Sequence, residues 1–129
     1  MITVAGVGPG NPRYLTVGVK EAIENSRCVL AFGRVGETLK DIRDDFIIVK
    51  RVEEVYNHSL KNSDLLILAS GDPCFYGILE YLKAKGISVD EVLPGISSFQ
   101  YMMGKLKKSW HNGEFMSFHG RSGRLKDVL

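Results

Sequence analysis

The run Leu65-Leu66-Ile67-Leu68-Ala69, followed by Ser70-Gly71-Asp72-Pro73, decides the fold class of this chain. Consecutive apolar residues without polar alternation predict a strand that is buried on both faces, as the central strand of a parallel sheet is. A sheet with two buried faces needs helices on both sides, which an architecture of alternating strands and helices supplies. Asp72 and Pro73, which follow the run, have the form of a helix N-cap and a proline at the first helical position.

Strands and helices are predicted to alternate on either side of this run. Further strands are predicted at residues 2–7, 28–32, 46–49 and 88–93, and helices at residues 16–25, 36–42, 52–60, 75–85 and 97–106. Thr16 is the expected N-cap of the first helix, and Gly86 is the expected stop of the fourth. The alternation predicts an α/β fold with an open, five-stranded, mostly parallel sheet and flanking helices.

The end of the chain departs from this pattern. Residues 109–114 are polar and include Gly113, and they are followed by a strand-like run at 115–119 and a helix-like run at 125–129. A lone strand and half a helix cannot bury their apolar faces. We therefore expect residues 1–110 to form one α/β domain. Residues 111–129 would be a linker and the beginning of a truncated second α/β domain.

Composition excludes several classes of protein. The chain has 129 residues, 44% of them hydrophobic, and a net charge of +2, which is too small for a general nucleic-acid binder. Neither a long apolar run nor a signal peptide is found, so a cytoplasmic protein is expected. Cys28 and Cys74 are far apart and match no metal spacing, so we expect two buried thiols and no metal site.

Three of the predicted strands end in loops rich in glycine, proline and serine, at the sheet edge where open α/β folds bind ligands. The loops are Gly-Val-Gly-Pro-Gly-Asn-Pro at 6–12, Ala-Ser-Gly-Asp-Pro-Cys-Phe-Tyr-Gly at 69–77 and Pro-Gly-Ile-Ser-Ser-Phe-Gln at 94–100. Each loop also has a purely structural interpretation. The first can be a tight turn, since it lacks the third glycine of a dinucleotide fingerprint. Asp72 can cap the helix after it, and Ser97 can form a capping box with Gln100.

The three loops in this order and spacing resemble the tetrapyrrole methylase superfamily, over residues 1 to about 104. Within it, the segments 70–77 and 94–100, together with Ser117-Phe118-His119-Gly120-Arg121, are most similar to the cobalt-precorrin-7 and precorrin-6Y C-5 methyltransferases. Asn11 departs from the pattern, because many members carry aspartate there. No role that needs a carboxylate is therefore expected of Asn11.

The resemblance implies methylation of a corrin precursor at C-5 in cobalamin biosynthesis, with S-adenosyl-L-methionine as methyl donor and S-adenosyl-L-homocysteine as product. It implies that Arg121 binds the substrate and that the cofactor is bound by Pro9, Gly71, Asp72, Phe75, Ser97 and Ser98. In-line placement of the methyl donor and acceptor, together with exclusion of water, can supply most of the rate enhancement, so no catalytic triad is expected. His119 and Tyr76 are candidate bases by location alone.

The implied partners are a small-molecule tetrapyrrole, a second copy of the chain in a homodimer and a separate decarboxylating C-15 methyltransferase, with neither nucleic acid nor membrane. Three alternatives stay open. The chain can be a diphthine synthase-like or RNA-directed methyltransferase of the same superfamily, an inactive fragment that keeps only the fold, or a nucleotide-binding α/β domain. The sequence leaves open whether the precursor contains cobalt.

Overall fold

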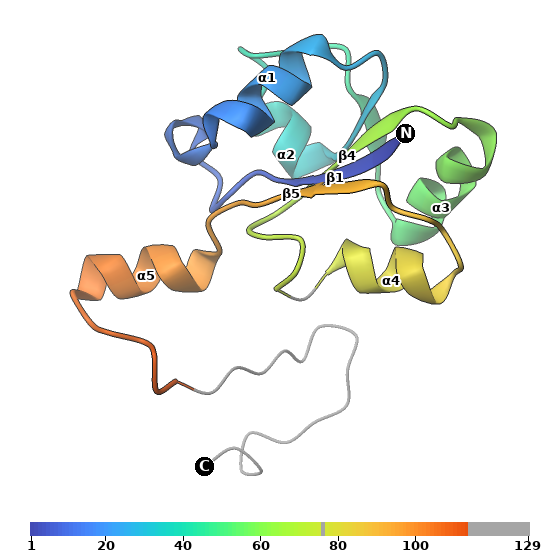
Figure 1. Cartoon of the computed structure of the whole chain (residues 1–129). Coiled ribbons are helices and arrows are strands. Elements are labelled where there is room, and N and C mark those ends of the chain that lie inside the picture. The colour runs from blue at the N-terminus through green and yellow to red at the C-terminus, as the bar shows by residue number, and fades with distance from the viewer. Residues whose placement is uncertain (76, 114–129) are drawn as a thin grey trace.

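The computed structural model describes residues 1–75 and 77–113, which form an α/β fold (Figure 1). The elements are β1 (Ile2–Gly6), the short 3-10 helix η1 (Pro12–Tyr14), α1 (Val17–Asn25), β2 (Val29–Phe32), α2 (Gly33–Thr38), β3 (Ile47–Val49), α3 (Val52–Lys61), β4 (Leu65–Ala69), α4 (Ile78–Ala84), β5 (Glu91–Leu93) and α5 (Ser98–Leu106). The sheet has five strands in the order β3-β2-β4-β1-β5, and all its pairings are parallel. The predicted fold class is confirmed. The elements predicted at 115–119 and 125–129 lie outside the described residues.

Strand β4 occupies the middle of the sheet, as its sequence predicts, and all five of its residues are buried. Because side chains alternate across a strand, it contributes to two cores. Leu65, Ile67 and Ala69 pack with residues of α3 and α4, whereas Leu66 and Leu68 pack with residues of α1. Figure 1 shows α1 and α2 on one side of the sheet and α3 and α4 on the other, with α5 set apart beyond the sheet.

Two predicted helices and one predicted strand start three residues away from their expected positions, while the other elements start within one residue of theirs. Helix α2 begins at Gly33 instead of 36, because Gly36 packs without a side chain against Ile48 and lets the helix follow β2 directly. Helix α4 begins at Ile78 instead of 75, since Gly77 has a φ of 133°, which ends the preceding loop. Strand β5 begins at Glu91, the partner of Thr3, instead of 88, and just before it the side chain of Asp90 accepts from Ile2 N at 2.7 Å.

The prediction of two buried thiols is wrong for one of the cysteines. Cys28 is partly buried at the start of β2, but Cys74 is exposed in the loop after β4. Cys74 lies in the turn that begins at Asp72, outside the core. In a loop the sequence has no periodic pattern from which the burial of a side chain could be predicted.

The carboxyl ends of β1, β4 and β5 meet backbone to backbone. A Cβ atom on Gly6 would lie 2.5 Å from the carbonyl oxygen of Gly71, and a Cβ atom on Gly95 would lie 2.3 Å from the same oxygen. The first two loops are also joined by reciprocal bonds, in which Gly8 N donates to Gly71 O at 3.2 Å and Gly71 N donates to Gly8 O at 2.9 Å. Only glycine fits at Gly6 and Gly95, so the three loops form one closely packed unit, the glycine junction.

Arg43 anchors the end of helix α1. Its guanidinium donates to the carbonyl oxygens of Ile23, Ser26 and Arg27, and its Nε donates to Asp45 Oδ1 at 2.6 Å. The carbonyls at a helix C-terminus lack partners within the helix and carry partial negative charge, so a guanidinium there is favourable. The hydrogen bond from Arg43 also lowers the pKa of the Asp45 carboxyl.

We predict that Gly95→Ala lowers the free energy of unfolding by about 1–3 kcal/mol or more, as overpacking against atoms that cannot move does. The atoms that its methyl group would meet are backbone atoms of Gly71 and Gly6, at 2.3 and 2.7 Å. Urea denaturation measures the change. The matched control is Gly104→Ala in α5, where a methyl group meets nothing within 4 Å. This control is expected to gain roughly 0.5–1 kcal/mol. Equal effects of the two changes would contradict the glycine junction.

We predict that Arg43→Met, which keeps most of the aliphatic chain but removes the donors, costs roughly 1–3 kcal/mol of stability, because two partly buried carbonyl oxygens lose a charged partner. The side chain of Arg43 is only 13% exposed. Thermal melting of this variant beside Arg13→Met, at an exposed position of η1, separates the anchoring bonds from a general loss of charge. A loss no larger than that of the control would count against the anchor.

Candidate functional site

The main cavity of the described residues lies where β1, β2, β4 and β5 end. It has a volume of about 410 Å³. Its walls come from the loops after these strands and from helix α2, and they comprise Val7, Gly8, Pro9, Gly10, Phe32, Arg34, Val35, Thr38, Leu39, Ser70, Gly71, Asp72, Phe75, Ser97 and Ser98. The volume falls in the range of small-molecule sites, roughly 300–1,000 Å³. Gly8 and Gly71, which join the first two loops, are among the lining residues, so backbone atoms are accessible to a ligand there.

All six residues singled out for cofactor binding line this one cavity: Pro9, Gly71, Asp72, Phe75, Ser97 and Ser98. They come from three segments of the sequence that the strand order brings to one sheet edge. Arg121, His119 and Tyr76 lie outside the described residues, so the structure does not place them. The convergence of the three loops is the main structural fact about the site.

Both carboxylate oxygens of Asp72 accept hydrogen bonds from the protein's own backbone. Its Oδ2 accepts from Cys74 N at 2.9 Å, and its Oδ1 accepts from Gly95 N at 3.0 Å. The interpretation of Asp72 as the cap of the next helix is wrong, because α4 begins at Ile78 with Gly77 as N-cap. Asp72 instead joins the loop after β4 to the loop after β5, and this fixes the relative position of two walls of the cavity.

The two serines differ in what their side chains do. Ser97 is buried and caps α5 in a capping box: its Oγ accepts from Gln100 N at 3.0 Å, and Gln100 Oε1 accepts from Ser97 N at 2.9 Å. This part of the sequence interpretation is confirmed. Ser98 is exposed, and its hydroxyl makes no hydrogen bond within residues 1–75 and 77–113. Capping therefore accounts for Ser97 and leaves the hydroxyl of Ser98 available to a ligand.

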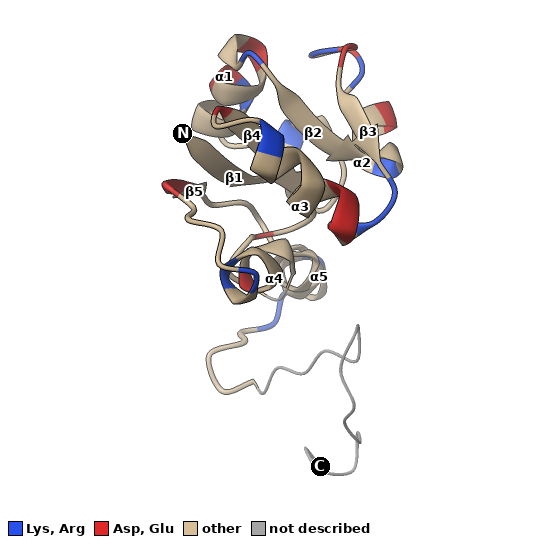
Figure 2. Cartoon of the chain, turned by 90° about the vertical axis from the view of Figure 1, so that its right-hand side faces the viewer, with Lys and Arg blue, Asp and Glu red and all other residues tan. Residues whose placement is uncertain are grey.

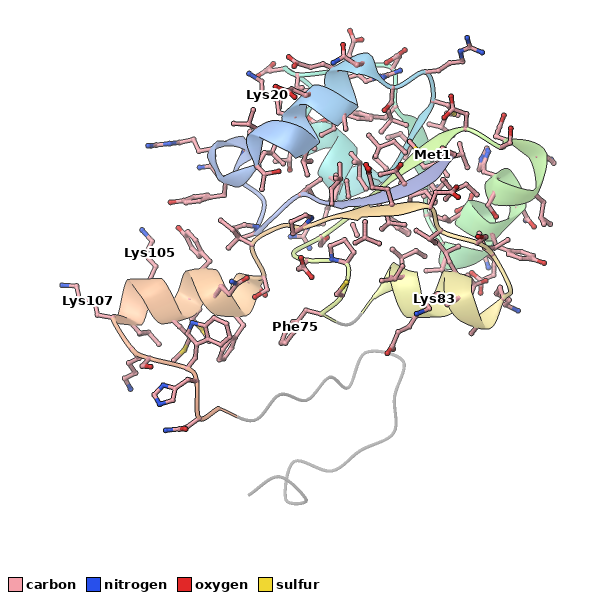
Figure 3. The ribbon with its side chains drawn as sticks, viewed as in Figure 1. Met1, Lys20, Phe75, Lys83, Lys105 and Lys107 are labelled. Carbon is pink, nitrogen blue, oxygen red and sulfur yellow. The ribbon has the colours of Figure 1, made fainter. Side chains whose placement is uncertain are left out.

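A second, smaller cavity adjoins the first. It has a volume of about 310 Å³ and shares Asp72, Phe75 and Ser97 with the main cavity. Figure 3 shows Phe75 at the tip of the loop after β4, with its ring directed away from the sheet. Phe99 and Trp110 also line the second cavity, with their rings edge to face at 5.9 Å. The two cavities are thus neighbouring compartments with a common wall.

Sequence reasoning missed the wall that β2 and α2 contribute. Phe32, Arg34, Val35, Thr38 and Leu39 line the main cavity, although no motif marks them. The only available signal was topological: β2 lies beside β4, so its carboxyl end shares the sheet edge with the three loops. Of the residues that line this cavity, Arg34 and Asp72 are the two that carry charge.

Residues 1–75 and 77–113 contain no group of three or more His, Cys, Asp or Glu side chains that could hold a metal ion. No helix among them is both long and apolar enough to cross a bilayer. On the face shown in Figure 2, basic and acidic residues are interspersed over α1, α3 and α4. That face therefore lacks the single-sign stripe typical of nucleic-acid binding.

Known proteins resemble this chain along its whole length. The chain is 33% identical to the probable cobalt-precorrin-7 C(5)-methyltransferase of Methanocaldococcus jannaschii, over 100% of the chain and 65% of that protein. It is 30% identical to the cobalt-precorrin-7 C(5)-methyltransferase of Salmonella typhimurium, over 94% of the chain and 62% of that protein. A probable cobalt-factor III C(17)-methyltransferase of Methanothermobacter thermautotrophicus is 27% identical, over 100% of the chain and 40% of that protein. The chain thus spans less than two thirds of the length of these relatives.

Solved structures share the fold. Precorrin-6Y methylase from Archaeoglobus fulgidus superposes with a TM-score of 0.67 at 23% identity, over 84% of this chain and 59% of that one. Uroporphyrin-III C-methyl transferase from Thermus thermophilus, solved in complex with S-adenyl homocysteine, superposes with a TM-score of 0.60 at 24% identity, over 75% of this chain and 45% of that one. The family model of the tetrapyrrole (corrin/porphyrin) methylases matches residues 1–129. The chain belongs to the tetrapyrrole (corrin/porphyrin) methylases.

Proposed function

We propose that this chain is the S-adenosylmethionine-binding part of a C-methyltransferase of cobalamin biosynthesis, and that its substrate is cobalt-precorrin-7 or precorrin-6Y, methylated at C-5. One observation carries the proposal: the three loops of a tetrapyrrole methylase bring six motif residues to one cavity. The C-5 assignment is supported by 33% and 30% identity to cobalt-precorrin-7 methyltransferases, against 29% and 27% to enzymes for C-11 and C-17.

The main cavity fits the proposed cofactor in size and in chemistry. Glycine backbone at Gly8, Gly10 and Gly71 permits close approach, while Phe32 and Phe75 offer aromatic surface for a nucleobase. When bound, S-adenosylmethionine would supply a methyl group activated by a positively charged sulfur. The protein's own residues would bind the cofactor, orient it and exclude water, which are the main requirements of a direct transfer.

The second cavity supports a reaction between two ligands. Methyl transfer requires donor and acceptor to meet, and the two cavities share a wall made by Asp72, Phe75 and Ser97. The aromatic rings of Phe99 and Trp110 suit a flat macrocycle. Because Asp72 is bonded to two backbone N–H groups, we assign it the placing of this wall and not proton transfer.

The domain boundary after residue 110 and the homodimer are further proposals. The first is supported by the polar, glycine-containing run at 109–113, which follows α5. The second is supported by exposed apolar side chains on and after α5, namely Met102, Leu106 and Trp110, which are 49%, 54% and 42% exposed.

We predict that S-adenosylhomocysteine binds to this chain in a calorimetric titration, with the M. jannaschii relative as positive control. Methyl transfer from labelled S-adenosylmethionine is expected to cobalt-precorrin-7, and not to an RNA or protein acceptor. Binding by the relative but not by this chain would contradict the cofactor assignment. Transfer to a different corrin carbon would keep the cofactor assignment and reject the C-5 assignment.

We predict that Asp72→Ala weakens S-adenosylhomocysteine binding about tenfold or more, because two backbone donors lose their acceptor and the wall between the cavities shifts, at a cost of roughly 1–3 kcal/mol. Ser98→Ala should weaken binding about two- to tenfold, because one neutral hydrogen bond to the ligand is lost. It should not change the melting temperature. Ser63→Ala, at an exposed serine remote from the cavity, is the matched control. Retention of full affinity by both variants would contradict the assigned binding residues.

A further inference from the structure

Arg34 is a charged residue of the main cavity that no sequence motif marks. It lies one residue after the start of α2, directly beyond the carboxyl end of β2, and it lines the cavity together with Val35, Thr38 and Leu39. Residues of the loops after β1, β4 and β5 contribute most of the remaining lining. Arg34 therefore belongs to the wall that α2 contributes, which contains none of the family's motif residues.

The guanidinium of Arg34 has no hydrogen-bond or ion-pair partner among the described residues. Thr38 Oγ1 donates to the backbone oxygen of Arg34, but the Arg34 side chain makes no hydrogen bond or ion pair within residues 1–75 and 77–113. Arg43, in contrast, uses its guanidinium to hold α1. The other charged group of the cavity, the Asp72 carboxylate, is occupied by Cys74 N and Gly95 N. Of the two charged side chains that line the cavity, only that of Arg34 has no hydrogen-bond partner within the described residues.

We propose that Arg34 binds a carboxylate of the ligand that fills this cavity. An arginine presents parallel N–H donors that match the two oxygens of a carboxylate. This inference rests on the proposed function, in which both ligands carry carboxylates: the amino-acid part of S-adenosylmethionine and the side chains of a tetrapyrrole. The shared chemistry is a carboxylate in a bidentate pair with the Arg34 guanidinium.

The chain offers a matched pair of variants for the test. Arg34→Gln removes the charge beyond the carboxyl end of β2, and Arg27→Gln removes an equal charge before its amino end, at an exposed residue outside the cavity. Three probes are titrated into each: S-adenosylhomocysteine, 5′-methylthioadenosine, which lacks the amino-acid part, and uroporphyrin III, a porphyrin with acetate and propionate side chains. Neither variant should alter the melting temperature, because both side chains are exposed.

The two sources of the carboxylate give different results. If Arg34 binds the cofactor, Arg34→Gln weakens S-adenosylhomocysteine about tenfold or more and leaves 5′-methylthioadenosine unchanged. If Arg34 binds the tetrapyrrole, the variant weakens uroporphyrin III by a similar factor and leaves both nucleosides unchanged. In either case Arg34→Lys should recover part of the affinity, because lysine keeps the charge but not the paired donors.

Three results would overturn the assignment. One is unchanged affinity of Arg34→Gln for all three probes, and another is an equal loss in Arg27→Gln. The third is an equal loss for S-adenosylhomocysteine and 5′-methylthioadenosine, which would mean a general effect on the nucleoside site. Failure of the unmodified chain to bind any probe would reject the proposed function, and the carboxylate assignment with it, before any variant is compared.

Discussion

The close approach of backbone atoms at Gly6, Gly71 and Gly95 is the constraint on which the rest of this structure depends. Three strand ends converge there at distances that leave no room for a Cβ atom on Gly6 or Gly95. The reciprocal bonds between Gly8 and Gly71 hold the first two loops together. Because the loops pack against one another through main chain, residues from all three of them line one cavity. The site is thus a consequence of how the sheet ends.

Polar groups around the cavity divide into those that build it and those that remain for a ligand. Asp72 joins two loops, and Ser97 caps α5, so both are satisfied within the protein. The hydroxyl of Ser98 and the guanidinium of Arg34 have no such partner in the described part of the chain. A site whose walls are fixed beforehand loses little conformational entropy when it binds. The two adjacent serines therefore have different roles, and their hydrogen bonds distinguish them: Ser97 caps a helix, whereas the hydroxyl of Ser98 remains available to a ligand.

The sequence predicted the elements whose cause is local and missed those whose cause is tertiary. The apolar run Leu65–Ala69 and the cap at Ser97 have the bounds and roles expected of them. The start of α4 was missed because Gly77 takes a positive φ in a loop whose path depends on its neighbours. The exposure of Cys74 has the same origin. Arg34 could not be assigned to the cavity, because its place there depends on the strand order and not on any spacing in the sequence.

The strand order also governs when the fold can form. Strand β1 precedes the other strands in the sequence, yet its neighbours in the sheet are β4 and β5, and Ile2 pairs with Leu65. During synthesis β1 therefore has no partner strand until β4 has left the ribosome. Contacts between such distant segments slow folding, and an unpaired apolar strand is open to wrong associations meanwhile. Ordered assembly of this sheet begins with the arrival of its middle strand, so any delay in translation before β4 lengthens the time for which β1 stays exposed.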